Sequence, residues 1–323
     1  MESSTSDAKP IVTWVGYYPV KSGGAVSFGK DEVHVDERGL AAHPARDPYG
    51  FACDRRFAVI GKNRDTFAWE KRTQRDPGFE KLALVQPSVA GEYLFLTTKG
   101  MRRIRIPLRK GHAGILSIDI WGDAADCAIL ESAHVERDDG SWEPMQCSEW
   151  LRALLLLHSN VRNTPEANIA KEARLVRQEG KRLLSKRAHT PPTTEASLAD
   201  GAHVLMIAQE WVEELNVILR ANGLPEVTMD QFRPNIVTRG GDLALNQPLG
   251  RIRLGSAELL DVRGCTRCSM VNVLQETGER IANGPLKVIV QQFQQIFGRY
   301  LLVAKPGYFY VGDTLKRIDT TSQ

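Results

Sequence analysis

Short runs of β-branched and aromatic residues, separated by Gly, Pro or Asp, recur along most of the chain and constrain its fold more than any other feature. Such runs predict strands, because branched side chains fit a pleated surface and the residues between them fit turns. In the first third of the chain the predicted strands are residues 11–18, 56–60, 92–97, 104–108 and 115–121. Many short strands at this spacing are typical of a barrel or curled sheet.

Strand-like runs return in the second half, interrupted by segments with helical spacing. Apolar residues three and four apart predict helices at 209–221, with Asn222 and Gly223 as a stop signal, and at 286–296. The strands predicted around them are residues 203–208, 236–238, 252–254, 258–262, 270–274, 300–304 and 309–311. The fold class expected is therefore β-dominated α+β, with a few packed helices.

The middle of the chain has a different character. A leucine-rich segment at 148–157 has helical spacing, and the following residues, 162–197, mix charge with Pro191 and Pro192 as long loops do. We expect a disordered leader at 1–10, an N-terminal β domain at 11–145, and a second domain at 146–323 that includes this loop.

Charge and composition exclude several classes of protein. The 42 basic and 39 acidic residues nearly balance, which argues against nucleic acid as a partner. No stretch approaches the roughly 20 apolar residues of a membrane span, and the polar start does not resemble an export signal. An odd count of 5 cysteines without such a signal indicates reduced thiols, so we expect a cytoplasmic protein.

Cys265 and Cys268, with Thr266 and Arg267 between them, form the segment richest in chemistry. A zinc site would need two further ligands at matching spacing, and a thioredoxin-like pair would need its first Cys at the start of a helix, whereas a strand is predicted to follow here. The pair could also be two small buried residues at a strand end. The remaining interpretation is a thiolate ligand for a soft metal other than zinc, with Arg267 favouring the ionised thiol.

The segment 232–237 contains Arg233, Pro234 and Asn235 in succession. Proline biases the preceding residue toward extended geometry, so Arg233 and Asn235 are predicted to project to the same side of the chain. Together they could hold a phosphate or the edge of a heterocycle. A strand end with a surface Arg explains the segment equally well.

Two N-terminal segments offer anion contacts. Lys21 and Ser22 follow a predicted strand, although Val15 and Val20 stand where a phosphate loop needs glycines. Arg55 precedes another strand, and alternation predicts that it and the next arginine point to opposite faces.

These segments, in this order, resemble the MOSC family, and more closely its members that carry a MOSC N-terminal barrel, such as the mitochondrial amidoxime-reducing component and its bacterial relatives. The resemblance implies a MOSC-type β-barrel preceded by that N-terminal β-barrel or curled-sheet domain. The segments that carry the resemblance are residues 18–22, 36–39, 54–57, 73–77, 82–85, 121–123, 198–200, 232–237, 264–268, 277–278, 297–298, 307 and 311–313.

The resemblance implies a molybdenum–molybdopterin cofactor. The residue at the position of Cys268 would be the protein's metal ligand and the catalytic centre, while the pterin dithiolene supplies two more sulfurs. Contacts to the cofactor fall on Lys21, Ser22, Arg55, Asp200, Arg233, Asn235, Thr266 and Arg267. Cations in this set suit an anionic cofactor, and Asn235 and Asp200 suit a pterin edge.

Several positions depart from the family pattern. Gly201 and Ala202 stand where relatives carry small hydroxyl residues, which implies the loss of two hydrogen bonds to the cofactor. Val271 and Leu274 replace the usual Thr and Asp, and residues 69–72 are also unusual. These changes leave Cys268 in place and affect the expected substrate.

The resemblance implies an oxidoreductase that removes oxygen from N-hydroxylated or N-oxygenated compounds such as amidoximes and hydroxylamines. Electrons would come from a separate small haem protein or flavoprotein reductase. One alternative is a sulfur carrier or cofactor-delivery module, although the pyridoxal-phosphate desulfurase domain of the family's sulfurase has no counterpart here. Another alternative is a diverged biosynthetic enzyme for a specialised metabolite.

Overall fold

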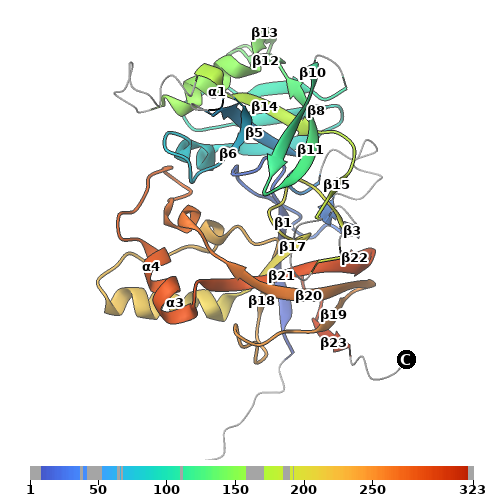
Figure 1. Ribbon diagram of the computed structural model, residues 1–323, viewed down its shortest axis with the longest axis vertical. Helices are drawn as coiled ribbons and strands as arrows, with labels where there is room; N and C mark the ends of the chain where they lie inside the picture. The colour runs from blue at the N-terminus through green and yellow to red at the C-terminus, as the bar shows by residue number, and fades with distance from the viewer. Residues whose placement is uncertain are drawn as a thin grey trace, which may run out of the picture.

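The structure is a computed structural model that describes residues 9–36, 39–41, 53–63, 66, 68–109, 112–157, 171–184, 190–191 and 193–318. Strands dominate these residues and form two bodies, one stacked on the other (Figure 1). The β-dominated α+β fold, with a closed barrel, a curled sheet and a few packed helices, confirms the prediction. The predicted leader lies outside the described residues except for 9 and 10, and so do residues 37 and 38 of the segment 36–39.

The lower body is built on an eight-stranded sheet. Its strands, in spatial order, are β2 (Val26–Ser27), β1 (Ile11–Tyr17), β18 (Ile236–Arg239), β17 (Val204–Ala208), β21 (Ile296–Lys305), β20 (Ala257–Thr266), β19 (Arg251–Leu254) and β23 (Lys316–Ile318). The central β17 is buried along its whole length, which explains its continuous run of apolar residues. β20 and β21 form the longest antiparallel pair, and Cys268 lies two residues beyond the end of β20, in the segment that joins the two strands.

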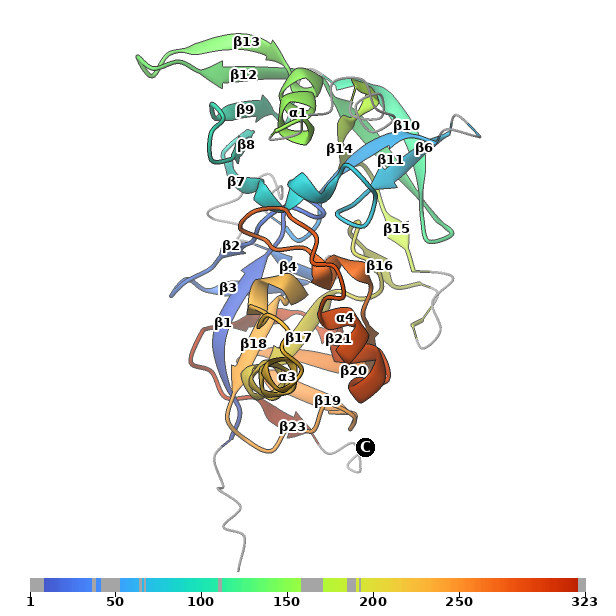
Figure 2. The same cartoon turned by 90° about the vertical axis from the view of Figure 1, so that its left-hand side faces the viewer.

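Two helices cover this sheet (Figure 2). α3 (Gln209–Ala221) buries Trp211, Leu215 and Leu219 in the main core, and α4 (Pro285–Phe293) buries Val288 and Ile289 there. The chain enters α3 directly from β17, as the change from strand-like to helical spacing predicts.

The upper body contains a closed barrel and a second sheet. The barrel strands are β10 (His112–Ile120), β11 (Asp123–Leu130), β14 (Arg174–Gln178), β5 (Phe57–Lys62) and β6 (Trp69–Arg72). The second sheet contains β13 (Trp142–Gln146), β12 (Ser132–Glu136), β9 (Ile104–Pro107), β8 (Tyr93–Thr97) and β7 (Gln86–Ala90). Helix α1 (Cys147–Leu155) buries Trp150 and Leu154 in the core that these strands enclose.

The two bodies do not follow the domain boundary that the sequence predicts at residues 145 and 146, because each body contains a strand from the other side of that boundary. β1, from the N-terminal part, pairs with β18 in the lower sheet, and β14, from beyond residue 146, completes the upper barrel between β11 and β5. The chain therefore passes between the two bodies more than once, and a site between them draws residues from both ends of the sequence.

The prediction of a loop at 162–197 is wrong for part of that range. Besides β14, it contains β15 (Arg182–Leu183) and β16 (Glu195–Ala196), which pair with each other. Arg182 is 1% exposed, and its guanidinium donates to the backbone carbonyls of Ser197 and Ala199. Charged residues made this range look like a loop, yet here they satisfy buried backbone groups. Residues 162–170, 185–189 and 192 lie outside the described residues.

Short elements complete the fold. A three-stranded sheet contains β22 (Gly307–Phe309), β3 (Val33–Asp36) and β4 (Gly39–Ala41). The 3-10 helices are η1 (Glu80–Leu84), η2 (Met229–Phe232) and η3 (Ser269–Asn272). Trp121, predicted to end a strand, instead lies in the turn between β10 and β11 with φ 62°, because β10 ends at Ile120.

Candidate functional site

A cavity of about 340 Å³ lies between the two bodies, and we call it the Cys268 cavity. Eight of the nine predicted site residues line it: Lys21, Ser22, Arg55, Asp200, Arg233, Thr266, Arg267 and Cys268. The other residues that line it are Arg75, Trp121, Leu205, Phe232, Arg263, Cys265, Met270, Gln295 and Tyr300. The fold thus gathers in one place segments that are far apart in the sequence.

Cys268 lies where β20 gives way to η3. Its thiol is half-buried, whereas that of Cys265, which also lines the cavity, is 2% exposed. The strand predicted at 270–274 is wrong, because the chain forms η3 instead and Val271 N–H donates to Cys268 O at 3.3 Å. The valines that suggested a strand are buried in a tight turn, which holds Cys268 at the cavity surface.

Arg267 holds the shape of this loop. One guanidinium nitrogen donates to Phe232 O at 2.7 Å, and another contacts Cys265 Sγ at 3.2 Å. Its backbone N–H donates to Gln295 O at 2.8 Å, and Gln295 Nε2 donates back to Arg267 O at 2.9 Å. The hydrogen bond that Arg267 makes to a thiol is therefore with Cys265.

Lys21 and Asp200 form an ion pair in the wall of the cavity. Lys21 Nζ donates to Asp200 Oδ1 at 2.7 Å and to Leu198 O at 2.9 Å. Burial lowers the pKa of Lys21 to about 8, although the nearby Asp200 charge opposes this shift. Burial by itself would raise the pKa of Asp200. The Lys21 charge and hydrogen bonds from Lys21 and Trp121 nevertheless hold that pKa well below its usual range.

Ser22 and Arg55 both have left-handed backbone geometry, with φ 70° and φ 50°. Ser22 is fixed from behind by Gln74, whose Nε2 donates to Ser22 O at 2.6 Å. Arg55 forms an ion pair with the neighbouring Asp54 and lines the Cys268 cavity, whereas Arg56 lines a different cavity. The prediction that these two arginines point in different directions is confirmed.

Arg233 does not have the extended geometry that Pro234 favours. Its φ is 56° and its ψ is 49°, because it ends η2, where its N–H donates to Asp230 O at 3.0 Å. Its guanidinium lies 4.2 Å from the centre of the Tyr18 ring and hydrogen-bonds to Gly23 O. Burial lowers its pKa to about 10. Arg233 therefore lines the cavity from a left-handed backbone and not from the extended backbone that the sequence predicts.

Asn235 does not line the cavity but lies behind it. Its Nδ2 donates to Asp54 Oδ1 at 3.0 Å and to Gly16 O at 3.2 Å, and its Oδ1 accepts from Leu205 N–H at 3.0 Å. This buried amide ties three segments of the cavity wall together. The geometry assigns it a supporting position in place of the predicted direct contact.

Several residues that line the cavity escaped the sequence analysis. Arg263 stacks over the Tyr300 ring at 4.8 Å, and Arg75 stacks over the Trp121 ring at 4.7 Å. Arg263 could have been found, because it stands two positions before Cys265 on β20, and alternate residues of a strand share a face. Arg75 lies after β6 and had no such signal.

Gly201 explains how Arg263 fits. A Cβ atom at Gly201 would stand 2.5 Å from Arg263 Nη2. The missing side chain leaves space for a guanidinium, which supplies hydrogen-bond donors near the position where a hydroxyl was expected. The other departures do not line the cavity: Ala202, Val271, Leu274 and residues 69–72. Val271 is fully buried.

The charge of the cavity suits an anionic ligand. Six of the described residues that line it are Lys or Arg, and one, Asp200, is a carboxylate. Arg233 Nη2 is buried and has no hydrogen-bond partner among the described residues. Buried donors are normally paired, so this atom indicates an acceptor that a ligand would bring. The phosphate and dithiolene of a molybdopterin fit this set of donors.

A metal at Cys268 would draw few ligands from the protein. Within the described ranges, no three His, Cys, Asp or Glu side chains gather as a group that could hold a metal. A centre bound here would need most of its ligands from a cofactor, as a dithiolene provides. Also among the described residues, no helix is long and apolar enough to cross a bilayer.

Comparison with known proteins places these features in context. Residues 193–316 match the model of the MOSC domain. The chain is 28% identical to mitochondrial amidoxime-reducing component 1 of Danio rerio, over 95% of this chain and 85% of that protein. It is 32% identical to the molybdenum cofactor sulfurase of Solanum lycopersicum, over 24% of this chain and 10% of that protein.

Among solved structures, the chain has a TM-score of 0.29 to the protein YiiM of Geobacillus stearothermophilus, at 20% identity over 38% of this chain and 56% of that one.

Proposed function

Since residues 193–316 form a MOSC domain, we propose that this protein is a molybdenum-cofactor-dependent oxidoreductase that reduces N-oxygenated compounds of the amidoxime or hydroxylamine type. The observation that carries the proposal is the half-buried Cys268 thiol in a cavity lined by six cationic side chains. Similarity to an amidoxime-reducing component over 95% of the chain supports the substrate class.

In this proposal Cys268 is the protein's ligand to molybdenum. Lys21, Arg55 and Arg233 hold the anionic groups of the cofactor through charge-assisted hydrogen bonds. Ser22, Asp200, Thr266 and Arg267 contribute further contacts from the same wall. Asn235 positions these residues from behind through Asp54 and the backbone of Leu205.

When bound, the cofactor would supply the two-electron redox chemistry that removal of oxygen from an N–O group requires. Two electrons and two protons convert the N–O group to an N–H group and one molecule of water. The electrons come from a separate donor, either a small haem protein or a flavoprotein reductase. Burial raises the pKa of Tyr300, so this phenol in the cavity wall remains protonated and can donate a hydrogen bond.

A reduction assay tests the proposal. Protein with a full molybdenum load, benzamidoxime as substrate and dithionite-reduced methyl viologen as electron source should give benzamidine. Cys268→Ser should lower the rate at least about 100-fold, because the thiolate tunes the metal. Cys265→Ser, three residues earlier at the end of β20, is the matched control and should retain most of the activity. Failure of the loaded wild type to reduce any of a panel of N-hydroxylated compounds would refute the substrate class.

The second candidate function is that of a sulfur carrier, in which Cys268 holds a persulfide. The short match to a molybdenum cofactor sulfurase favours it, together with a second thiol, Cys265, in the same cavity. A separate desulfurase would supply the sulfur. Mass spectrometry after incubation with a desulfurase and cysteine should then find 32 additional mass units, about one sulfur atom, on Cys268. An unmodified Cys268 would eliminate this candidate.

A further inference from the structure

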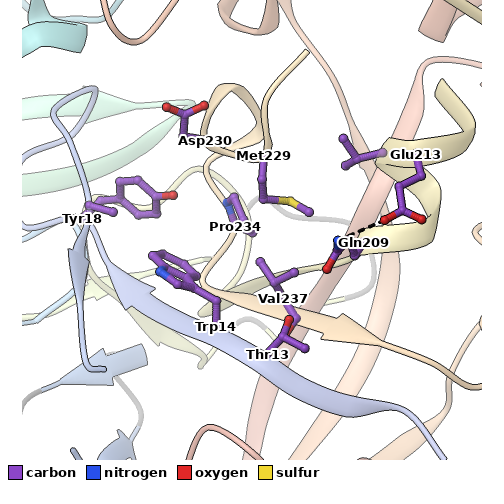
Figure 3. A pocket seen from close by; sticks show the side chains of 11 residues that line it. Thr13, Trp14, Tyr18, Gln209, Glu213, Met229, Asp230, Pro234 and Val237 are labelled. Atoms are coloured by element: carbon purple, nitrogen blue, oxygen red, sulfur yellow. Dashed lines mark hydrogen bonds between the residues drawn. The ribbon is translucent and has the colours of Figure 1, made fainter. Parts of the chain in front are cut away.

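A second cavity, of about 540 Å³, opens beside the Cys268 cavity without sharing any lining residue with it, and we call it the Trp14 cavity (Figure 3). Its lining residues are Thr13, Trp14, Tyr18, Ala25, Gln209, Val212, Glu213, Met229, Asp230, Pro234 and Val237. Tyr18 separates the two cavities, because Arg233, which lines the other one, stacks on its ring at 4.2 Å. The proposed function uses none of the residues of the Trp14 cavity.

The walls of the Trp14 cavity are mostly apolar and come from rigid elements. Trp14 stands on β1, Val237 on the neighbouring β18, and Val212 on α3. Figure 3 shows Trp14 and Tyr18 on one side of the space and Gln209 with Glu213 on the other. A cavity of this size with aromatic and aliphatic walls is within the range that holds drug-sized molecules, roughly 300–1,000 Å³.

The charged groups of the Trp14 cavity are both carboxylates. Among the described residues that line it, Glu213 and Asp230 are acidic, and none is Lys, Arg or His. Asp230 accepts from Thr228 Oγ1 and makes no ion pair within the described residues. Glu213 accepts from Gln209 Nε2 at 3.0 Å and is 4.0 Å from Arg239 Nη2, a pair in which both side chains are more than half exposed. Asp230 also lines a neighbouring cavity together with Lys81, Lys99 and Arg233, so cations lie on its far side, whereas none lines the Trp14 cavity among the described residues.

We propose that the Trp14 cavity binds an organic cation with an aromatic or alkyl body, such as an arylamidinium or a hydrophobic amine. The body would lie against Trp14, Met229 and Val237, and the cationic group would meet Asp230 or Glu213. A bare metal ion does not suit the cavity, because Figure 3 shows the carboxylates of Asp230 and Glu213 apart from each other, and most of the other lining residues are apolar. The proposal is independent of the proposed function.

Calorimetric titration of the full chain tests this proposal with three probes of similar shape. The probes are biphenyl-4-carboxamidinium, the neutral biphenyl-4-carboxamide, and the anionic biphenyl-4-carboxylate. We expect the amidinium to bind about tenfold more tightly than the amide, since both carboxylates attract it and each exposed charge contributes about threefold. The carboxylate should bind more weakly than the amide. Equal binding of amidinium and amide would overturn the claim that the cavity selects cations.

Substitutions locate the binding site. Asp230→Asn and Glu213→Gln keep the shape of each side chain and should each weaken amidinium binding about threefold, with a loss of about tenfold in the double variant. Glu214→Gln, the next residue of α3 and outside the cavity, is the matched control and should bind as the wild type does. Amidinium binding unchanged in the double variant would place the ligand elsewhere and refute the site.

A further variant separates the two cavities. Cys268→Ser should leave amidinium binding unchanged, because Cys268 lines the other cavity. Loss of binding in Cys268→Ser, with Asp230→Asn unaffected, would assign the probe to the Cys268 cavity and contradict the proposal.

Discussion

At the scale of single residues, burial brings the pKa of one cation in the Cys268 cavity close to physiological pH. The Lys21 side chain is 4% exposed, whereas that of its partner Asp200 is 40% exposed. Burial disfavours the ammonium, so its pKa falls to about 8, close to physiological pH. Arg233, whose pKa burial lowers to about 10, keeps its proton at neutral pH. Of these two buried cations, Lys21 is therefore the more sensitive to pH.

We predict that cofactor retention weakens as pH rises from 7 to 9. Lys21 is protonated below a pH of about 8 and attracts an anionic cofactor, and this attraction disappears as the ammonium loses its proton. Release of pterin from loaded protein, followed by its fluorescence, should accelerate several-fold across this window. In Lys21→Met release should be fast at pH 7 and nearly independent of pH. A steep pH response that persists in Lys21→Met would assign the effect to another group.

Gly201 and Arg263 should behave as a coupled pair. We predict that Gly201→Ser displaces Arg263, since a Cβ atom would approach Nη2 to 2.5 Å, and that cofactor retention falls several-fold. Arg263→Gln should cause a similar loss, and the double variant should lose little more than either single variant. The dissociation rate of the cofactor is measured for the wild type, the two single variants and the double variant. Strictly additive losses would show that the two positions act independently.

The sequence predicts which residues meet in the cavity better than it predicts how they do so. Lys21, Arg55 and Cys268 line the cavity as the resemblance implies. Arg233 could not be placed correctly, because its left-handed backbone depends on η2 and on the distant Gly23 carbonyl. Asn235 lies behind the wall for a similar reason, since its partners are far away in the sequence. Local spacing carries no information about such long-range hydrogen bonds.

At the scale of elements, hydrophobic periodicity finds the long and well-ordered segments. The helix predicted at 209–221 coincides with α3, and the strand predicted at 203–208 becomes β17 with a start one residue later. The failures are η3 and β14. Val271 in η3 and Val273 directly after it read as a strand, and the arginines of β14 read as a loop. In both cases tertiary burial overrides the local preference.

The junction of β1, β17 and β18 should depend on the amide of Asn235. We predict that Asn235→Ala lowers the free energy of unfolding by about 3 kcal/mol, because it leaves Leu205 N–H and Gly16 O without their buried partner. Urea unfolding measures this change. Asn222→Ala, at the exposed end of α3, is the control and should change stability by less than about 1 kcal/mol. A loss below 1 kcal/mol for Asn235→Ala would contradict the assigned supporting position.

At the scale of the whole molecule, the site exists because the chain passes between two bodies. Lys21 and Arg55 come from the N-terminal segments, whereas Arg233 and Cys268 come from the part of the chain that matches the MOSC domain, and they meet in one cavity. Composition and periodicity predict the fold class, but they do not predict that β1 joins the lower sheet and β14 the upper barrel. The reason is physical, because strand pairing between distant segments is set by burial and register across the whole sheet.

The role of Cys268 is tested by the molybdenum and pterin content of protein purified from a host that makes the cofactor, for wild type, Cys268→Ser and Cys265→Ser. We expect nearly one molybdenum and one pterin per chain in the wild type and in Cys265→Ser, and a marked loss of molybdenum in Cys268→Ser. Pterin should persist in part in Cys268→Ser, because Arg233 and the other cations remain. A wild type without molybdenum or pterin, or a Cys268→Ser variant that keeps its full metal load, would contradict the central claim.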